Sequence, residues 1–304
     1  MSLTHRQFEV LVTIERHQEK KHTQRKLATT LNVSLGVINK IIGELLENEL
    51  IVQKETSRFE VTLKGYQWLE PYKVKKAVLL AAGFGSRLVP ITLNTPKPLI
   101  HVNGKRLIDS LLDALLAAGI TDITIVRGYL GDQFDVLLKK YPMLKFIDNP
   151  LFNETNNISS AYLARNLFEG AYIMEADLIV YHPELIRRYE YHTNYLAMPV
   201  KKTDDWCFEV KNHIITHVKV GGENCYHMYG ISYWNEEDGK QMLLDLDTSY
   251  HAPGGKECYW DVVAINHFPN HYNIYVREVK PNEIIEIDTF TELTQLDPVY
   301  AIGK

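Results

Sequence analysis

The chain has 304 residues, of which 45% are hydrophobic and 23% are charged, and its formal net charge is -5. A chain of this length usually divides into domains, and the composition is that of a soluble globular protein. The net charge argues against nucleic-acid binding over the whole surface, but it is compatible with a local basic patch. No apolar run reaches the ~18 residues of a membrane span, and the N-terminus lacks a signal-peptide core, so we expect a cytoplasmic protein with no membrane partner.

Neither cysteine nor histidine spacing predicts a metal site. Cys207, Cys225 and Cys258 are widely spaced and contain no CxxC pair. Their odd number and spacing predict neither a zinc site nor a disulfide framework, so reduced thiols are expected. The twelve histidines show no HxH or HExxH spacing.

Residues 1–72 follow a pattern of their own. Apolar residues recur at helical spacing in three runs, and Thr23 and Ser34 stand at the expected N-caps of the second and third. The segment of residues 31–34 is short enough to form a tight turn between two helices. Residues 50–63 alternate apolar and polar around a polar turn, which predicts a two-stranded wing. Residues 4–68 thus resemble the winged helix-turn-helix domains of bacterial transcription regulators.

A second pattern begins after Pro71, which disfavours helix at Glu70 and marks a boundary. Apolar strands then alternate with amphipathic helices, which predicts a mostly parallel, mixed sheet with helices on both faces. The strands are expected at 77–80, 123–126 and 171–174, and the helices at 107–118 and 132–140. We therefore predict a winged helix-turn-helix domain at 1–72 and a Rossmann-like α/β domain at 73–304.

A glycine loop of sequence LAAGFGSRL follows the first strand of the second domain, at residues 80–88. Its small residues let backbone N–H groups turn inward around an anion, and Arg87 offers a forked cation for phosphate. The loop is neither a Rossmann fingerprint, because Leu88 replaces the third glycine, nor a Walker A loop. By itself, such a loop could also be only a tight turn.

The residues that follow the loop make the prediction more specific. From Leu80 to Lys97 the chain carries L-A-A-G-x-G-(S/T)-R-(L/M)-x-P-x-T-x-x-x-P-K without a gap. This is the opening signature of the sugar-phosphate nucleotidyltransferase superfamily, which the chain therefore resembles. The resemblance implies that Lys97 contacts the phosphate of the second substrate or the α-phosphate of an NTP. It also implies that the NTP is bound by the loop residues Leu80, Ala81, Ala82, Gly83, Phe84, Gly85, Ser86 and Arg87.

Two aspartates stand where strands are expected to leave the sheet. Asp177 follows an apolar strand, and Asp288 ends the alternating run 284–288, before a helix expected to be capped near Thr289. Ligand sites lie at such strand ends, although a lone aspartate could instead cap a helix. The superfamily holds its metal with two aspartates at matching places, so the resemblance assigns Mg²⁺ to Asp177 and Asp288. Glu286 lies on the same face as Asp288, either to bind substrate or to support the site.

Residues 75–297 resemble the bacterial choline-phosphate cytidylyltransferases. The matching stretches are 146–149, 156–162, 205–206, 229–234, 259–261 and 286–288. The resemblance implies transfer of CMP from CTP to phosphocholine, with CDP-choline and pyrophosphate as products. The chain departs from that family at residues 1–72, and at Leu178, where the family often has asparagine.

A physical argument also favours a cationic acceptor. A quaternary ammonium cannot donate a hydrogen bond, so proteins bind it on aromatic faces, often beside a carboxylate. The candidates for such a substrate site are Trp206, Tyr259, Trp260, Asp261 and Glu286. Core packing is the alternative for the aromatic residues, and it is the role we expect for Trp234.

The predicted reaction is an in-line attack of an acceptor phosphate oxygen on the α-phosphorus of CTP. Arg87, Lys97 and Mg²⁺ on Asp177 and Asp288 would stabilise the developing charge. The first alternative is the same chemistry on phosphoethanolamine, aminoethylphosphonate or a sugar-1-phosphate. The second is a transcription regulator whose second domain senses a nucleotide without turnover.

The first domain is nearly neutral, with ten Lys or Arg and nine Asp or Glu in residues 1–72. Dedicated DNA-binding domains are usually more basic. Arg25, Asn39, Lys40 and Arg58 nevertheless stand where a winged helix contacts double-stranded DNA. We favour DNA binding over a purely structural role or a role in forming a homodimer.

Overall fold

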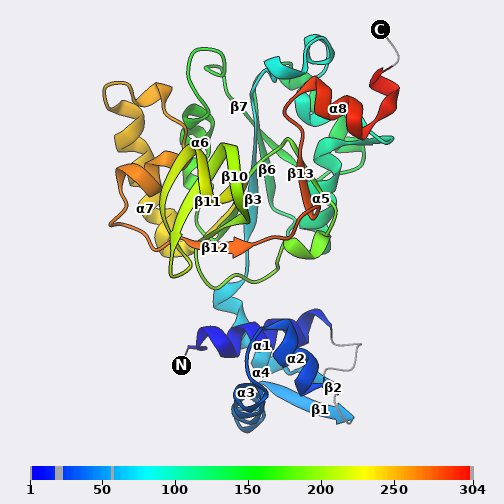
Figure 1. Ribbon diagram of the computed structural model, residues 1–304, viewed down its shortest axis with the longest axis vertical. Coiled ribbons are helices and arrows are strands. Elements are labelled where there is room, and N and C mark those ends of the chain that lie inside the picture. The colour runs from blue at the N-terminus through cyan, green and yellow to red at the C-terminus, as the bar shows by residue number, and fades with distance from the viewer. Residues whose placement is uncertain (1, 18–22, 56–57, 302–304) are drawn as a thin grey trace. The chain divides into compact units, whose positions relative to one another are not determined.

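Two compact units make up the chain. The computed structural model describes residues 2–17, 23–55 and 58–301, and the chain divides into Met1–Lys73 and Val74–Lys304 (Figure 1). The predicted fold class, a mostly parallel α/β sheet domain preceded by a small winged helix-turn-helix domain, is confirmed. Within the described ranges, no helix is long and apolar enough to cross a membrane.

The N-terminal unit follows the predicted order of helices and wing. Thr23 accepts a hydrogen bond from the backbone N–H of Lys26 at 3.1 Å, and Ser34 accepts one from Val37 at 3.4 Å, so both predicted N-caps are confirmed. A short helix after the wing, capped by Thr62, is not predicted by the sequence pattern. The elements are α1 (His5–Arg16), α2 (Gln24–Thr30), α3 (Leu35–Glu47), β1 (Ile51–Glu55), β2 (Arg58–Val61) and α4 (Leu63–Leu69).

The apolar faces of these helices form the core of the unit. Phe8 and Leu11 of α1 and Ile38 of α3 are fully buried, as their helical spacing predicts. The wing strands β1 and β2 pair antiparallel, with Ile51 opposite Val61. Residues 56–57, in the predicted polar turn, lie outside the described residues.

The second unit is built on a seven-stranded sheet with the order β10-β12-β11-β8-β3-β6-β7. Strand β3 pairs parallel with β6 and β8, and β6 pairs parallel with β7, whereas β11 runs antiparallel to β8. The strands are β3 (Lys76–Ala81), β6 (Ile123–Arg127), β7 (Lys145–Asp148), β8 (Ala171–Glu175), β10 (Asn194–Lys211), β11 (Ile214–Trp234) and β12 (Tyr275–Glu278). β3 is apolar almost throughout because helices cover both faces of the sheet.

Helices cover the sheet in two layers. α5 (Leu107–Ala117) packs on one face, and α6 (Ile158–Ala164) and α7 (Glu236–His251) pack on the other (Figure 1). The helix predicted at 132–140 is instead a 3₁₀ helix, η5 (Gly131–Lys139). Its buried residues, Phe134 and Leu137, are three apart, which matches the three-residue turn of that helix.

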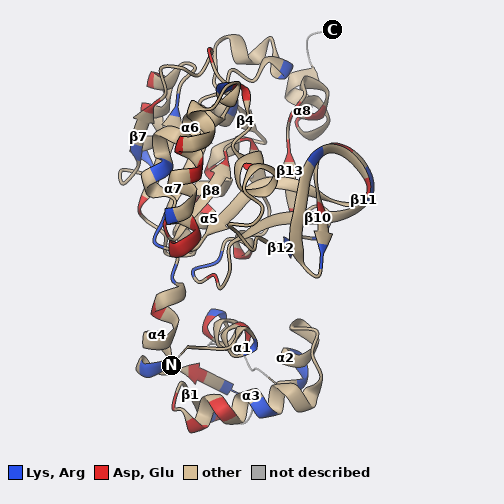
Figure 2. Cartoon of the chain, turned by 90° about the vertical axis from the view of Figure 1, so that its left-hand side faces the viewer, with Lys and Arg blue, Asp and Glu red and all other residues tan. Residues whose placement is uncertain are grey.

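Two further strand pairings shape the site edge of the sheet. The short strand β13 (Ile284–Glu286) pairs with β9 (Leu178–Val180), which places Glu286 opposite Leu178. β10 and β11 form a long antiparallel hairpin at the side of the unit (Figure 2). β4 (His101–Val102) and β5 (Lys105–Arg106) form a small separate pair, and α8 (Phe290–Leu296) follows β13 with Thr289 as its N-cap, as predicted.

Candidate active site

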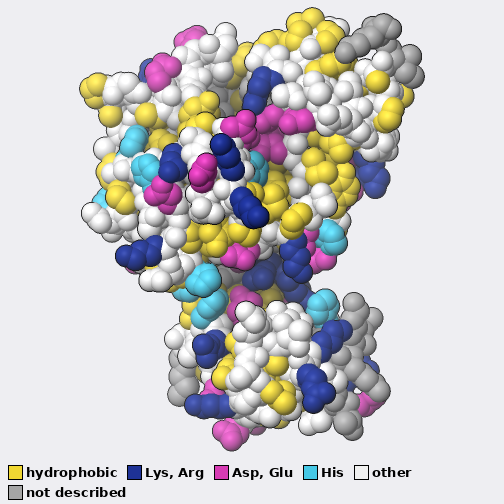
Figure 3. All heavy atoms as spheres, viewed as in Figure 1, with side chains coloured by type: hydrophobic (Ala, Val, Ile, Leu, Met, Phe, Trp, Pro, Cys, Tyr) yellow, Lys and Arg dark blue, Asp and Glu magenta, His cyan; other side chains and the backbone are white. Residues whose placement is uncertain are grey.

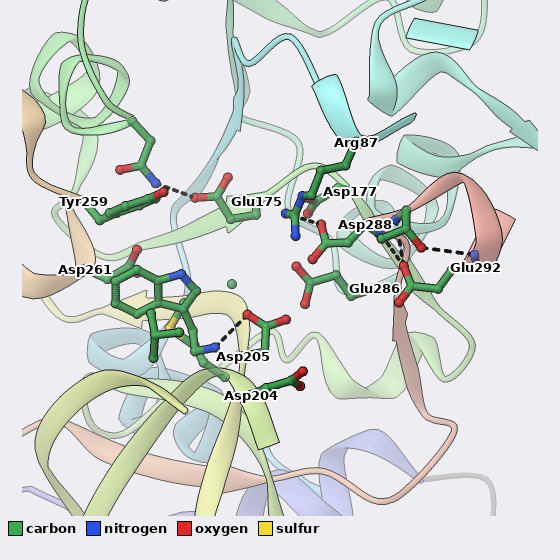
Figure 4. A pocket seen from close by; sticks show the side chains of 16 residues that line it. Arg87, Glu175, Asp177, Asp204, Asp205, Tyr259, Asp261, Glu286, Asp288 and Glu292 are labelled. Atoms are coloured by element: carbon green, nitrogen blue, oxygen red, sulfur yellow. Dashed lines mark hydrogen bonds and ion pairs between the residues drawn. The ribbon is translucent and has the colours of Figure 1, made fainter. Parts of the chain in front are cut away.

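A pocket of about 650 Å³ opens at the carboxyl ends of the central strands. The predicted site residues that line it are Arg87, Asp177, Trp206, Tyr259, Asp261, Glu286 and Asp288. Figure 4 shows them on two sides, with Arg87, Asp177, Glu286 and Asp288 facing Tyr259 and Asp261. The structure therefore brings together residues that stand up to 201 positions apart in the chain.

The glycine loop leaves β3 beside this pocket. Gly85 has a φ of +67°, and a Cβ atom there would lie 3.1 Å from Cβ of Lys97 and 3.2 Å from Cγ2 of Thr92. The Thr92 hydroxyl donates to the carbonyl oxygen of Gly85 at 3.0 Å. Glycine is required here both by the left-handed backbone and by the close approach of the Lys97 segment.

Lys97 lies at the centre of an ionic cluster. Its Nζ atom is 2.8 Å from Oδ2 of Asp177 and 2.9 Å from Oδ1 of Asp288, and Arg87 contacts the same oxygen of Asp288 at 2.8 Å. Burial by itself would lower the pKa of Lys97, but Asp177 and Asp288 together raise it above its ordinary value. The ammonium group therefore stays charged at neutral pH.

Three carboxylates beside Lys97 are suited to a divalent cation. Ligand oxygens of Asp177, Glu286 and Asp288 lie within 4.8 Å of one another. Oδ1 of Asp177 is buried without a hydrogen-bond partner among the described residues. Hard carboxylate oxygens are the ligands that Mg²⁺ prefers, so these residues fit it. Burial, followed by the charges of Asp177 and Asp288, raises the pKa of Glu286 well above its usual range.

An aromatic pair lies on the other side of the pocket. The ring centroids of Trp206 and Tyr259 are 4.9 Å apart, with an angle of 59° between the planes. Tyr259 is 42% exposed and Trp206 is half-buried. Asp204 and Asp205, which precede Trp206 on β10, line the same pocket. This side of the pocket offers both aromatic surface and negative charge.

Trp260 was predicted to be a substrate-site residue, but the structure places it in the core. Its side chain is 1% exposed and packs against Phe168, Tyr195 and Trp234 in the core, so it does not line the pocket. The neighbouring Tyr259 points into the pocket and Trp260 points inward. Trp234 is fully buried in the same core, as expected.

Two acids, Asp261, which is buried, and Glu175, which is half-buried, form the inner wall of the aromatic side. Asp261 is 4% exposed and accepts a hydrogen bond from the hydroxyl of Tyr195 at 3.0 Å. Burial raises its pKa to about 7, against the opposing effect of that hydrogen bond. Glu175, which sequence reasoning missed, accepts from Nδ2 of Asn157 at 3.3 Å. Its position at the carboxyl end of β8, two residues before Asp177, is the signal that could have found it.

The ionisation of Asp261 predicts a pH effect on stability. Its pKa is 3.8 when unperturbed and about 7 in the folded chain, so the folded state binds the proton more tightly. The wild-type protein should therefore lose stability as pH rises from about 4 through 7, by a few kcal/mol in total. Urea unfolding at pH 5 and pH 8 should show a smaller loss in Asp261→Asn, with Glu223→Gln, an exposed control, resembling wild type. An equal pH effect in all three proteins would contradict this assignment.

A smaller cavity of about 200 Å³ adjoins the glycine loop. The predicted loop residues Leu80, Ala82 and Gly83 line it, together with Asn149. The side-chain amide of Asn149 donates to the hydroxyls of Ser159 and Ser160 at 2.9 and 3.0 Å. The side chains of Asn149, Ser159 and Ser160 are buried. Asn157 and Glu175 line both cavities, so the two are neighbours. The other loop residues, Ala81, Phe84, Gly85 and Ser86, do not line this smaller cavity, and Phe84 packs on Tyr129.

This fold and this site define an α/β transferase of phosphorylated substrates. A glycine loop, a buried lysine, an exposed arginine and a carboxylate trio converge at the ends of parallel strands, and such groups act by positioning phosphates and neutralising charge.

Comparison with known proteins identifies the family. The nucleotidyl transferase family model matches residues 76–193, and the MarR family model matches residues 3–56. The chain is 34% identical to the 2-aminoethylphosphonate cytidylyltransferase of Lancefieldella rimae, over 74% of this chain and 92% of that protein. It is 29% identical to the choline-phosphate cytidylyltransferase of Streptococcus pneumoniae, over 74% and 97%. The chain therefore belongs to the nucleotidyl transferase family and carries a MarR-type N-terminal domain.

A solved structure supports the same assignment. The CTP:phosphocholine cytidylyltransferase of Streptococcus pneumoniae is similar to this chain with a TM-score of 0.69 and 30% identity, over 75% of this chain and 99% of that one. Both resemblances at the level of the domain, to nucleotidyltransferases and to winged helix-turn-helix proteins, are thus confirmed.

Proposed function

We propose that this chain transfers CMP from CTP to a small acceptor with a phosphate or phosphonate at one end and an ammonium group at the other. The observation that carries the proposal is the two-sided pocket, with cations and a carboxylate trio facing an aromatic pair and further acids. Relatives named for CTP with phosphocholine and for 2-aminoethylphosphonate support it. Phosphocholine is the acceptor predicted from the sequence, and phosphoethanolamine, 2-aminoethylphosphonate and a sugar-1-phosphate are the alternatives.

Each group has a role in an in-line transfer. An oxygen of the acceptor attacks the α-phosphorus of CTP, and pyrophosphate leaves. Lys97 and Arg87 neutralise charge that develops on the phosphates. The direct attack requires no covalent intermediate with the enzyme. Mg²⁺ held by Asp177, Glu286 and Asp288 would supply further charge neutralisation. The cavity beside Gly83 and Asn149 is the proposed place of the cytosine base.

The test is pyrophosphate release by the full chain with Mg²⁺, measured for each of the four common NTPs and for several acceptors. We expect turnover with CTP and an ammonium-bearing phosphate or phosphonate, and little with a sugar-1-phosphate. A preference for glucose-1-phosphate would reject the proposed acceptor class. Binding of CTP without turnover on any acceptor would favour a nucleotide-sensing regulator.

We also propose that the MarR-type domain binds double-stranded DNA. Arg25, Asn39 and Lys40 are exposed on α2 and α3, and only a distant contact of 3.9 Å joins Lys40 to Glu44. Arg58 is less available, because it pairs with Glu60 at 3.1 Å. Acidic and basic residues are interspersed over this unit (Figure 2), and basic side chains are scattered on the face seen in Figure 3. Any DNA contact must therefore be local, around the N-terminal half of α3.

The Asn39→Ala/Lys40→Ala double variant is therefore expected to bind DNA more weakly than wild type. Removing one phosphate contact and one polar contact near the base edges should weaken binding by roughly ten-fold or more. A mobility-shift assay with DNA from upstream of the protein's own gene, at low salt, compares the variant with wild type. Arg58→Ala is the matched variant with a smaller expected effect. The absence of any shift with wild type would leave the domain a structural or homodimer-forming role.

A further inference from the structure

The acids that line the pocket fall into two groups with different partners. Asp177 and Asp288 contact the cationic side chains of Lys97 and Arg87. The acids on the aromatic side have neutral donors instead. Glu175 accepts from the amide of Asn157, and Asp205 accepts from the backbone N–H of Trp206 (Figure 4). Asp261 accepts from the hydroxyl of Tyr195.

Glu175 and Asp261 form a pair that a ligand cation would stabilise. Both line the pocket; Asp261 is buried and Glu175 is half-buried, and the hydrogen-bond donors that the structure gives them, the hydroxyl of Tyr195 and the amide of Asn157, are neutral. A buried carboxylate with only neutral partners keeps much of its desolvation cost, which a hydrogen-bonded cation offsets.

Gly230 packs closely against the side chain of Glu175. A Cβ atom at Gly230 would lie 2.4 Å from Cγ and 2.9 Å from Cβ of Glu175. Gly230 lines the pocket on β11, beside the strand that carries Glu175. A larger residue at position 230 would therefore displace the side chain of Glu175 from its present position.

The aromatic surface beside these acids consists of two rings, those of Trp206 and Tyr259. Trp206 and Tyr259 pack against each other, so part of each ring is covered, and Trp260 lies in the core. A trimethylammonium ion donates no hydrogen bond, so it would leave the acceptor oxygens of Glu175 and Asp261 without a charged donor. A primary ammonium donates three hydrogen bonds and can serve both acids.

We infer that the cationic end of the acceptor is a primary ammonium group, which donates to Glu175 and Asp261 while Trp206 and Tyr259 cover its methylene chain. This inference rests on the proposed function and names its substrate class as primary aminoalkyl phosphates and phosphonates. Asp204 and Asp205 at the mouth of the pocket add attraction for the same cation.

A methylation series tests the inference directly. Phosphoethanolamine, its N-methyl and N,N-dimethyl derivatives, and phosphocholine form a series in which each step replaces one hydrogen-bond donor on nitrogen by a methyl group. At saturating CTP and Mg²⁺, kcat/KM should fall along this series by roughly ten-fold or more in total. 2-Aminoethylphosphonate should be used at a rate closer to that of phosphoethanolamine than to that of phosphocholine. An equal or higher kcat/KM for phosphocholine would overturn the inference.

Substitutions separate hydrogen bonding from aromatic contact. Asp261→Asn should lower kcat/KM for phosphoethanolamine by roughly ten-fold, with a smaller loss for phosphocholine and an unchanged KM for CTP. Glu175→Gln should likewise lower kcat/KM more for phosphoethanolamine than for phosphocholine. Trp206→Ala should weaken both acceptors alike, and Glu223→Gln, which lies outside the pocket on β11, should change neither. Equal losses for both acceptors in Asp261→Asn and Glu175→Gln would contradict a primary ammonium site.

The two proposals fail in different ways. If the wild-type chain turns over phosphocholine better than every less methylated acceptor, only the inference is rejected. If no ammonium-bearing acceptor supports pyrophosphate release from CTP, the proposed function is rejected as well.

Discussion

Asp288→Asn is expected to lower the rate of CMP transfer by about 10²–10³-fold. Asp288 accepts from both Arg87 and Lys97 through one oxygen, and it belongs to the carboxylate trio with Asp177 and Glu286. The substitution keeps the shape of the side chain but removes the charge that holds two cations and a metal in place. Both kcat and the response to Mg²⁺ should therefore change.

The measurement is initial-rate pyrophosphate release over a range of Mg²⁺ concentrations, with Mn²⁺ binding followed independently by electron paramagnetic resonance. Asp132→Asn removes an exposed carboxylate on η5 and is the matched control, expected to behave as wild type. Asp288→Asn with near wild-type activity and Mn²⁺ binding would remove Asp288 from the catalytic and metal-binding assignment.

The contiguous parts of the site could be predicted from the sequence. Leu80 to Lys97 is a single run, and the structure explains its spacing through the close approach of Gly85 to Lys97. The meeting of Asp177 with Asp288 depends on the pairing of β9 with β13, more than 100 residues apart. No local pattern contains that pairing, so only the family resemblance pointed to it.

Other features could not be predicted because the sequence alone does not determine the direction in which a side chain points. Tyr259 and Trp260 are adjacent and both aromatic, yet one is 42% exposed and the other 1% exposed. Glu175 was missed because a single acid at the end of the apolar strand β8 looks like a strand terminus. The 3₁₀ geometry of η5 was missed because apolar residues three apart fit an α-helix as well.

Lys97→Ala is expected to lower the transfer rate by about 10²–10³-fold while strengthening divalent-cation binding. Lys97 is 8% exposed and contacts two of the three candidate metal ligands, at 2.8 and 2.9 Å. Its removal leaves Asp177, Glu286 and Asp288 close together without their buried cation. Mutual repulsion of these carboxylates should destabilise the fold by about 3–5 kcal/mol in the absence of divalent cations.

The metal affinity of Lys97→Ala distinguishes two possible roles of Lys97. One role is to hold the carboxylates in their metal-binding geometry, and the other is to act directly on the substrate phosphates. Mn²⁺ titration by electron paramagnetic resonance should give a lower Kd for Lys97→Ala than for wild type, and Mg²⁺ should raise the Tm of the variant more. Lys105→Ala, an exposed lysine on β5, is the matched control. Weaker Mn²⁺ binding in Lys97→Ala would mean that the ammonium group holds the carboxylates in their binding geometry. Tighter Mn²⁺ binding in Lys97→Ala would mean that the ammonium group of Lys97 repels the metal ion. The contribution of Lys97 to catalysis would then come from its direct contact with the substrate phosphates.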